Sequence, residues 1–156
     1  VENTDVLTEL LNRRGMLQRL EASSQKSFHL LLADVDFFKR INDEYGHDAG
    51  DYALTELSQI FRVSLPENDL AARWGGEEFL IALCNKTESE AFMFAEALRQ
   101  RVEAFEFVYL DHRFKLTLSF GVATMNATTS LREAITLADS RLYQAKRSGR
   151  NQTRRA

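Results

Sequence analysis

The sequence has only one cysteine and one proline among its 156 residues. The single cysteine, Cys84, cannot form a disulfide within the chain, and its place in an apolar run predicts a small buried core residue. Nothing therefore points to an oxidising compartment. We expect a cytoplasmic location, although a region preceding this segment could anchor the full-length protein to a membrane.

Long apolar stretches are also missing. The longest one, Leu30 to Ala33 with Phe28 just before it, is too short to cross a bilayer, so we expect no membrane contact by this segment. The formal net charge of −3 argues against non-specific nucleic-acid binding. The C-terminal end is basic, and a solvated tail is its simplest interpretation; a nucleic-acid-binding role for that tail would predict salt-sensitive binding.

The content of hydrophobic residues, 44%, and of charged residues, 28%, fits one globular domain over residues 1–156 with a substantial core. The chain begins without a methionine and close to its first motif. We therefore expect a single domain excised from a longer, multidomain protein.

Hydrophobic periodicity predicts an α+β domain with a central mixed, mainly antiparallel sheet flanked by helices. Residues 46–50 are expected to form a loop, and Thr87 with Glu90 has the pattern of a helix-capping box. Alternation along residues 114–122 predicts a half-exposed strand. The expected helices cover residues 13–23, 38–45, 51–65, about 88–105 and 131–149, and the expected strands cover residues 28–35, 69–74, 78–84, 107–110 and 114–122.

Two glycines between two predicted strands form the most informative stretch, Arg73-Trp74-Gly75-Gly76-Glu77-Glu78-Phe79. The Gly-Gly pair can supply the positive φ angles of a tight hairpin, or its missing side chains can let a ligand approach the backbone. The two neighbouring carboxylates repel each other, which favours a cation or a metal-bound polyphosphate nearby.

Other polar residues allow both structural and functional interpretations. Asp34 ends an apolar strand, where an ionised carboxylate needs a metal, a hydrogen-bond donor or water. Asp51 can be a helix cap, and His47 can be a donor in a loop. Asp36 remains open.

The chain resembles the GGDEF family, the diguanylate cyclases, in the variant with Glu at the third signature position. Four further stretches match the family in order: residues 5–14 (DVLTELLNRR), 34–39 (DVDFFK), 42–51 (ND followed by GHDAGD) and 142–151 (LYQAK through GRN). The resemblance implies a palm-like nucleotide-cyclase fold with a ferredoxin-like core. It implies a nucleotidyltransferase that condenses two GTP into cyclic di-GMP and releases two pyrophosphates.

The resemblance also implies partners and cofactors. The product is made from two nucleotides, so the family pattern implies a homodimer formed through the active-site face, with one GTP per subunit. An upstream sensory or dimerisation domain is expected. Mg²⁺ or Mn²⁺ is expected as cofactor, with two ions per active site.

Site residues carry over from the family by position. Glu77 and Glu78 are the catalytic candidates, and Glu77 is also the expected proton acceptor. Because residues 77 and 78 point to opposite faces of a regular strand, only one of them is expected to face the metal. The implied metal ligands are the Asp34 carboxylate, the Val35 carbonyl and the Glu77 carboxylate. The implied substrate-binding residues are Asp51 and Asn42 for guanine, Lys39, Lys146, Arg150 and the amides of Phe37 and Phe38 for phosphate, and His47 without an assigned part of the nucleotide.

Two positions depart from the family pattern. Glu9 stands where the family usually has glycine, which questions the turn there. In the Arg-x-x-Asp motif of the product-inhibitory site, Pro66 replaces the arginine while Asp69 remains, so we expect that site to be lost. The alternative to an active cyclase is a catalytically inactive module that binds GTP or cyclic di-GMP.

Overall fold

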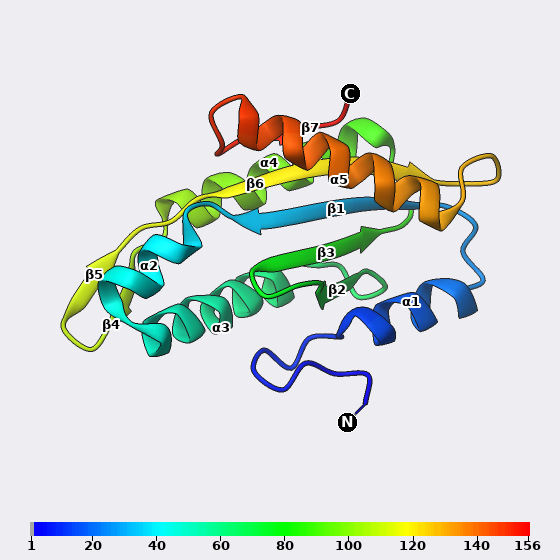
Figure 1. Cartoon of the computed structure of the whole chain (residues 1–156). Helices are drawn as coiled ribbons and strands as arrows, with labels where there is room; N and C mark the ends of the chain where they lie inside the picture. Colours follow the sequence, from blue (N-terminus) through cyan, green and yellow to red (C-terminus); the bar gives the residue numbers. More distant parts are fainter. Residues whose placement is uncertain (1) are drawn as a thin grey trace.

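Strand β1 (Phe28–Val35) lies at the centre of a five-stranded sheet in the computed structural model, which describes residues 2–156 (Figure 1). Neighbouring strands are antiparallel except for β6 and β7, which are parallel, so the predicted mixed, mainly antiparallel sheet is confirmed. The sheet order is β2 (Leu70–Arg73), β3 (Glu78–Leu83), β1, β6 (Leu118–Met125) and β7 (Thr153–Arg154).

Helices cover both faces of this sheet, as Figure 1 shows. One face carries α3 (His47–Ser64) and α4 (Glu88–Ala104), together with the short α2 (Phe38–Tyr45) that precedes α3. The other face carries α1 (Arg13–Ala22) and α5 (Leu131–Arg147). A separate hairpin pairs β4 (Phe107–Tyr109) with β5 (His112–Phe114). Within residues 2–156, no helix is long and apolar enough to cross a membrane.

The burial of β1 explains why it is the central strand. All eight of its residues are buried, as expected for a strand covered on both faces. Side chains alternate, so Leu31 and Ala33 join the core under α3 and α4, while Leu30 and Leu32 join the core under α1 and α5. By the same alternation Asp34 lies on the face covered by α5.

Local sequence signals set most helix ends. The capping box predicted at Thr87 and Glu90 is present, and Ser130 with Glu133 forms a second one at the start of α5. The loop predicted for residues 46–50 is wrong, because α3 already begins at His47. Gly46, with φ of 96°, makes the reversal between α2 and α3 on its own, a conformation that glycine adopts without steric cost.

The predicted strand over residues 114–122 is also wrong in detail. It divides into β5 and β6, and β6 is not half-exposed, because Ser119 and Gly121 are buried beneath α5. A Cβ atom on Gly121 would collide with the backbone of α5 at Ala138, so this glycine allows the close approach. Strand β7 was not predicted, since two residues carry no periodicity.

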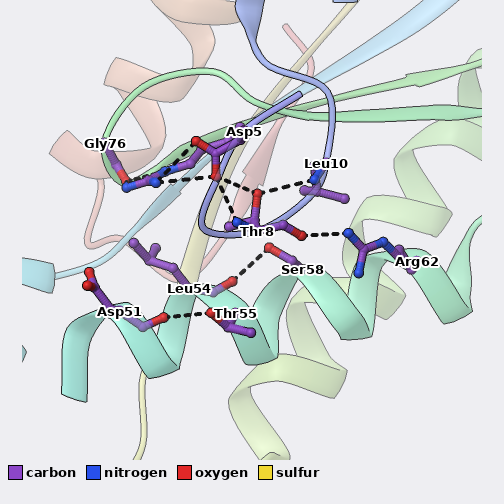
Figure 2. Close-up of polar contacts among 10 residues, drawn as sticks. Asp5, Thr8, Leu10, Asp51, Leu54, Thr55, Ser58, Arg62 and Gly76 are labelled. Carbon is purple, nitrogen blue, oxygen red and sulfur yellow. Dashed lines mark hydrogen bonds and ion pairs between the residues drawn. The ribbon is translucent and has the colours of Figure 1, made fainter. Parts of the chain in front are cut away.

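The segment before α1 is tied to both the β2–β3 hairpin and α3. Asp5 accepts hydrogen bonds from the amide (2.9 Å) and hydroxyl (2.8 Å) of Thr8, and Arg62 of α3 donates to the Thr8 carbonyl (Figure 2). Arg73 of β2 pairs with Asp5 at 3.4 Å. The turn at Glu9 forms despite the absence of the family's glycine, and Glu9 has a left-handed φ of 64°.

We expect Glu9→Gly to stabilise the chain by about 0.5–1 kcal/mol, because glycine adopts positive φ without the clash that a Cβ atom introduces. Urea unfolding would measure the change, with Glu9→Ala as the control, since alanine removes the charge but keeps the Cβ. Equal stabilisation by both substitutions would show that the charge, and not the backbone conformation, is responsible.

Candidate active site

The turn between β2 and β3 carries the Gly-Gly pair. The amides of Trp74 and Gly75 both donate to the Glu78 carbonyl, at 2.7 and 3.2 Å. In the described chain, Gly46 and Gly149 are the glycines with positive φ, so the interpretation of Gly75 and Gly76 as positive-φ residues is wrong. A Cβ on Gly76 would meet nothing within 4 Å, which leaves this turn open to an approaching molecule.

The carboxylates of the signature lie beside the end of β1. Asp34 and Glu78 are directly paired across the β1–β3 ladder, and the Val35 amide donates to the Glu77 carbonyl at 3.2 Å. Burial, and after it the nearby charge of Asp34, raises the pKa values of both glutamates. Glu77 precedes the first residue of β3, so strand alternation does not constrain it. The expectation that only one of the two glutamates faces a metal stays a prediction.

Asp34 forms an ion pair with Lys146 of α5 through Oδ2. The residue is only 5% exposed, and its second oxygen, Oδ1, is buried without a hydrogen-bond partner. A buried charged oxygen is costly when unpaired. The site therefore offers a free anionic ligand position, which suits a cation.

A pocket of about 190 Å³ surrounds this ion pair. Its walls come from the end of β1, the start of α2, the signature turn and the end of α5. With the exception of Asp36, its lining consists of residues that the sequence singles out as site candidates: Asp34, Val35, Phe37, Phe38, Lys39, Glu77, Lys146 and Arg150.

Phe37 has an unusual position at the mouth of this pocket. It adopts a left-handed φ of 56° and is 48% exposed, and its ring contacts the guanidinium groups of Arg40 at 4.2 Å and Arg150 at 4.5 Å. The ring of Phe38, in contrast, is buried in the core. Both residues open α2, where main-chain N–H groups have no partner within the helix.

The residues expected to bind guanine lie at the α2–α3 corner, outside that pocket. The side-chain oxygen of Asn42 is buried without a partner, and a Cβ on Gly50 would collide with it. Asp51 is exposed and lies within α3. The predicted cap role of Asp51 is wrong, since Gly46 holds the N-cap position, and His47 is the first residue of the helix and not a loop donor.

Asp69 is engaged by the protein through one oxygen, while its Oδ2 is buried without a hydrogen-bond partner. Its Oδ1 accepts from the amide of Cys84 at 2.9 Å, and Cys84 is a buried free thiol, as predicted. Pro66 and Arg62 line the same pocket as Asp69, of about 400 Å³. Arg62 is held by the Thr8 carbonyl and the Gln59 side chain.

Residues 2–156 contain no group of three or more His, Cys, Asp or Glu side chains arranged to hold a metal ion. The candidate set has two carboxylates and one backbone carbonyl. Such a set suits a hard ion that keeps several of its waters, and the unpaired Oδ1 of Asp34 is consistent with it.

Sequence reasoning missed several charges near Glu78. Arg13 donates to the Trp74 carbonyl at 3.3 and 3.2 Å and lies over the Trp74 ring. Its charge opposes the rise that burial and Asp34 cause in the pKa of Glu78, whereas Asp139 of α5 adds to that rise. The four-residue spacing predicts that Asp139 and Tyr143 lie on the same side of α5. It does not predict that this side faces Glu78.

Glu77 has the clearest perturbation, because burial and then the charge of Asp34 raise its pKa from 4.5 to about 7. At pH values between 4.5 and about 7, Glu77 keeps its proton in the folded chain and has lost it in the unfolded chain. Without metal, the stability contributed by this proton is therefore present at low pH and is lost as the pH rises towards 7. Allowing for solvent screening, we expect a loss of about 1 kcal/mol from pH 5 to pH 7.

Urea unfolding in chelator at pH 5, 6 and 7 would measure this loss. Glu77→Gln cannot titrate and is the control, so its stability should change less over the same range. An identical pH dependence in the two proteins would place the titration on another group.

The fold and the site together define a palm-like α+β domain in which clustered carboxylates face basic side chains from α2 and α5. The family model described as "Diguanylate cyclase, GGDEF domain" matches residues 2–152. The chain belongs to this family.

Two curated relatives and one solved structure show the extent of the similarity. The chain is 37% identical over 158 residues to Diguanylate cyclase A of Treponema denticola and 40% identical over 154 residues to Diguanylate cyclase DosC of Escherichia coli. These alignments cover 95% and 94% of this chain but 43% and 34% of the relatives. The GGDEF domain of DgcB from Caulobacter crescentus, solved with c-di-GMP, superposes with a TM-score of 0.92 at 28% identity, over 99% of this chain and 96% of that one.

Proposed function

We propose that this chain is the catalytic domain of a diguanylate cyclase, which condenses two GTP into cyclic di-GMP and releases two pyrophosphates. The observation that carries the proposal is the pocket in which Asp34, Glu77 and Lys146 meet, with one buried oxygen of Asp34 unpaired. Relatives of known name at 35–40% identity support the same reaction.

Asp34, Glu77 and the Val35 carbonyl would hold Mg²⁺ or Mn²⁺, with two ions in the complete site. Bound there, the metal would supply charge neutralisation on the phosphates and acidify the attacking hydroxyl. The Val35 amide donates to the Glu77 carbonyl at 3.2 Å, which holds the backbone of Glu77 beside the end of β1.

The other residues of the proposal act on the nucleotide. Lys39, Lys146 and Arg150 neutralise phosphate charge, and the free N–H groups at the start of α2 donate to phosphate oxygens. Asp51 accepts the paired N–H donors of guanine beside Asn42, with His47 nearby. Glu77 accepts the proton of the attacking 3′-hydroxyl, and Glu78 supports the site from the facing strand position.

A second copy of the chain is required by the product's chemistry. One domain offers one nucleotide site, and the twofold product needs two sites facing each other, so we propose a homodimer formed through the active-site face with one GTP per subunit. The chain spans less than half the length of the two relatives described above. An upstream sensory or dimerisation domain, and a cytoplasmic location where GTP is plentiful, belong to the same proposal.

The deciding experiment incubates the purified chain with GTP and Mg²⁺ and separates the products by chromatography. Cyclic di-GMP should form, and specific activity should rise with protein concentration because catalysis needs two chains. Binding of GTP without any product, at concentrations where the chain is shown to be dimeric, would favour the alternative of an inactive binding module.

The last part of the proposal concerns inhibition by the product, cyclic di-GMP. We infer that the inhibitory site is degenerate, because Pro66 lacks a guanidinium, one oxygen of Asp69 is bound by Cys84, and Arg62 is held by Thr8 and Gln59. Noncompetitive inhibition by low-micromolar cyclic di-GMP that Asp69→Ala abolishes would contradict this.

A further inference from the structure

Asp36 follows Asp34 by two residues, yet its oxygens are used differently. Asp36 is 4% exposed. Its Oδ1 accepts from the Ser119 hydroxyl at 2.7 Å, and its Oδ2 accepts from the Thr117 hydroxyl at 2.6 Å and from the main-chain amide of Asn151 at 3.0 Å. Both oxygens are therefore satisfied by the protein, whereas Oδ1 of Asp34 has no partner.

The bond from Asn151 reaches the turn that follows α5. Arg150 and Asn151 have φ values of 62° and 47°, two consecutive left-handed residues that are not glycine. Each costs on the order of 1 kcal/mol, so surrounding contacts must hold the turn in place. On the side of α4 the Asn151 side chain bonds Arg99 at 2.8 Å and Glu103 at 2.7 Å, and on the side of the sheet the contact is Asp36.

The turn carries Arg150 into the pocket, where its guanidinium lies over the ring of Phe37. Phe37 directly follows Asp36 in the chain. Asp36 thus fixes both partners of this stack, since its backbone leads into Phe37 and its carboxylate holds the residue next to Arg150.

We propose that Asp36 is a positioning residue that sets Arg150 for the triphosphate, and that it is not a metal ligand. The inference rests on the proposed function, because it takes GTP as the ligand of this pocket. This positioning role requires the shape and the hydrogen-bond-accepting oxygens of the Asp36 side chain, and it does not require the negative charge.

The test compares shape with charge at position 36. Asp36→Asn keeps the shape: its amide oxygen can accept from Asn151 and Thr117, while its NH₂ group donates to the Ser119 hydroxyl. Asp36→Glu keeps the charge but moves the carboxylate by one methylene. The probe is 3′-deoxy-GTP with Mg²⁺, which lacks the attacking hydroxyl and cannot react, and GMP is the comparison ligand without the outer phosphates.

We expect Asp36→Asn to bind 3′-deoxy-GTP within about threefold of the parent chain, and Asp36→Glu to lose roughly 10- to 100-fold, the effect of a lost charge-assisted phosphate contact. GMP affinity should stay nearly constant in both. Arg150→Ala should lose as much as Asp36→Glu, and the double variant should lose little more, because the two changes remove the same contact.

Ser119→Ala is the matched control for general destabilisation. It removes a donor from the Oδ1 of Asp36 but leaves the Asn151 bond on Oδ2, so 3′-deoxy-GTP affinity should be kept while the midpoint of urea unfolding falls. Equal loss of 3′-deoxy-GTP affinity in Ser119→Ala and Asp36→Glu would overturn the proposal.

The reverse order at position 36, with Asp36→Glu retained and Asp36→Asn impaired, would also overturn it and would identify a role for the charge. If the parent chain itself binds no 3′-deoxy-GTP, the proposed function fails and this inference fails with it. If the parent chain binds and both position-36 variants bind equally well, only this inference fails.

Discussion

Glu77→Gln should lower the rate of cyclic di-GMP formation by at least about 100-fold. The substitution keeps the size of the side chain but removes a charge beside Asp34, and it removes the proposed proton acceptor. The same substitution should raise the stability of the metal-free chain near pH 7, because the carboxylate of Glu77 is held close to Asp34 and partly buried, and its pKa is raised to about 7. Loss of activity together with gain of stability is the combination expected of a functional group and not of a structural one.

Rates of product formation at saturating GTP and Mg²⁺ would measure the effect, with circular dichroism to show that the fold is kept. Glu21→Gln is the matched control, since it makes the same chemical change on an exposed part of α1. Activity of Glu77→Gln within a few-fold of the parent chain would remove Glu77 from the mechanism.

Lys146→Met should lower the free energy of unfolding of the metal-free chain by about 2 kcal/mol. Breaking a buried ion pair typically costs about 3–5 kcal/mol, and the Lys146 side chain, 32% exposed, lets water compensate part of that. The cost arises because Asp34 would keep a buried charge with neither oxygen paired.

The double variant Asp34→Asn/Lys146→Met separates this cause from lost packing. Removing both charges should recover most of the stability, as replacing a whole buried pair usually does. Mn²⁺ should stabilise Lys146→Met more than it stabilises the double variant, because only the single variant keeps the Asp34 carboxylate. Equal destabilisation of the single and double variants would show that the methylene chain of Lys146, and not its charge, supports the fold.

Local signals in the sequence were enough for much of the fold. The apolar run of β1 and the capping box at Thr87 and Glu90 depend on neighbours in the chain, and both are confirmed with their expected bounds. The exposure of β6 could not be predicted, because the small residues Ser119 and Gly121 read as a solvent face until α5 is known to lie on them. Strand β7 depends likewise on a partner that is distant in sequence.

The candidate site divides in the same way. Resemblance to the family gave residue types at positions such as Asp34, Glu77 and Lys146, and the structure places these three in one pocket. The resemblance could not predict which hydrogen-bond donors reach each carboxylate oxygen of Asp34 and Asp36. These two residues are identical and only two positions apart, yet they meet different donors from strands and turns more than 80 residues away. The left-handed backbone of Phe37 is another property that no local pattern indicates.

In the proposed metal site, the pairing of Lys146 with Asp34 means that an incoming metal ion would compete with a cation that belongs to the chain itself. A tethered competitor acts at an effective concentration in the millimolar range or above, and dilution does not remove it. A bare divalent ion at the unpaired Oδ1 would repel the ammonium group on Oδ2 without offering it a new partner. A metal ion arriving on a triphosphate brings that partner with it, so the displaced Lys146 can move from carboxylate to phosphate, and cation exchange makes the binding of metal and nucleotide mutually dependent.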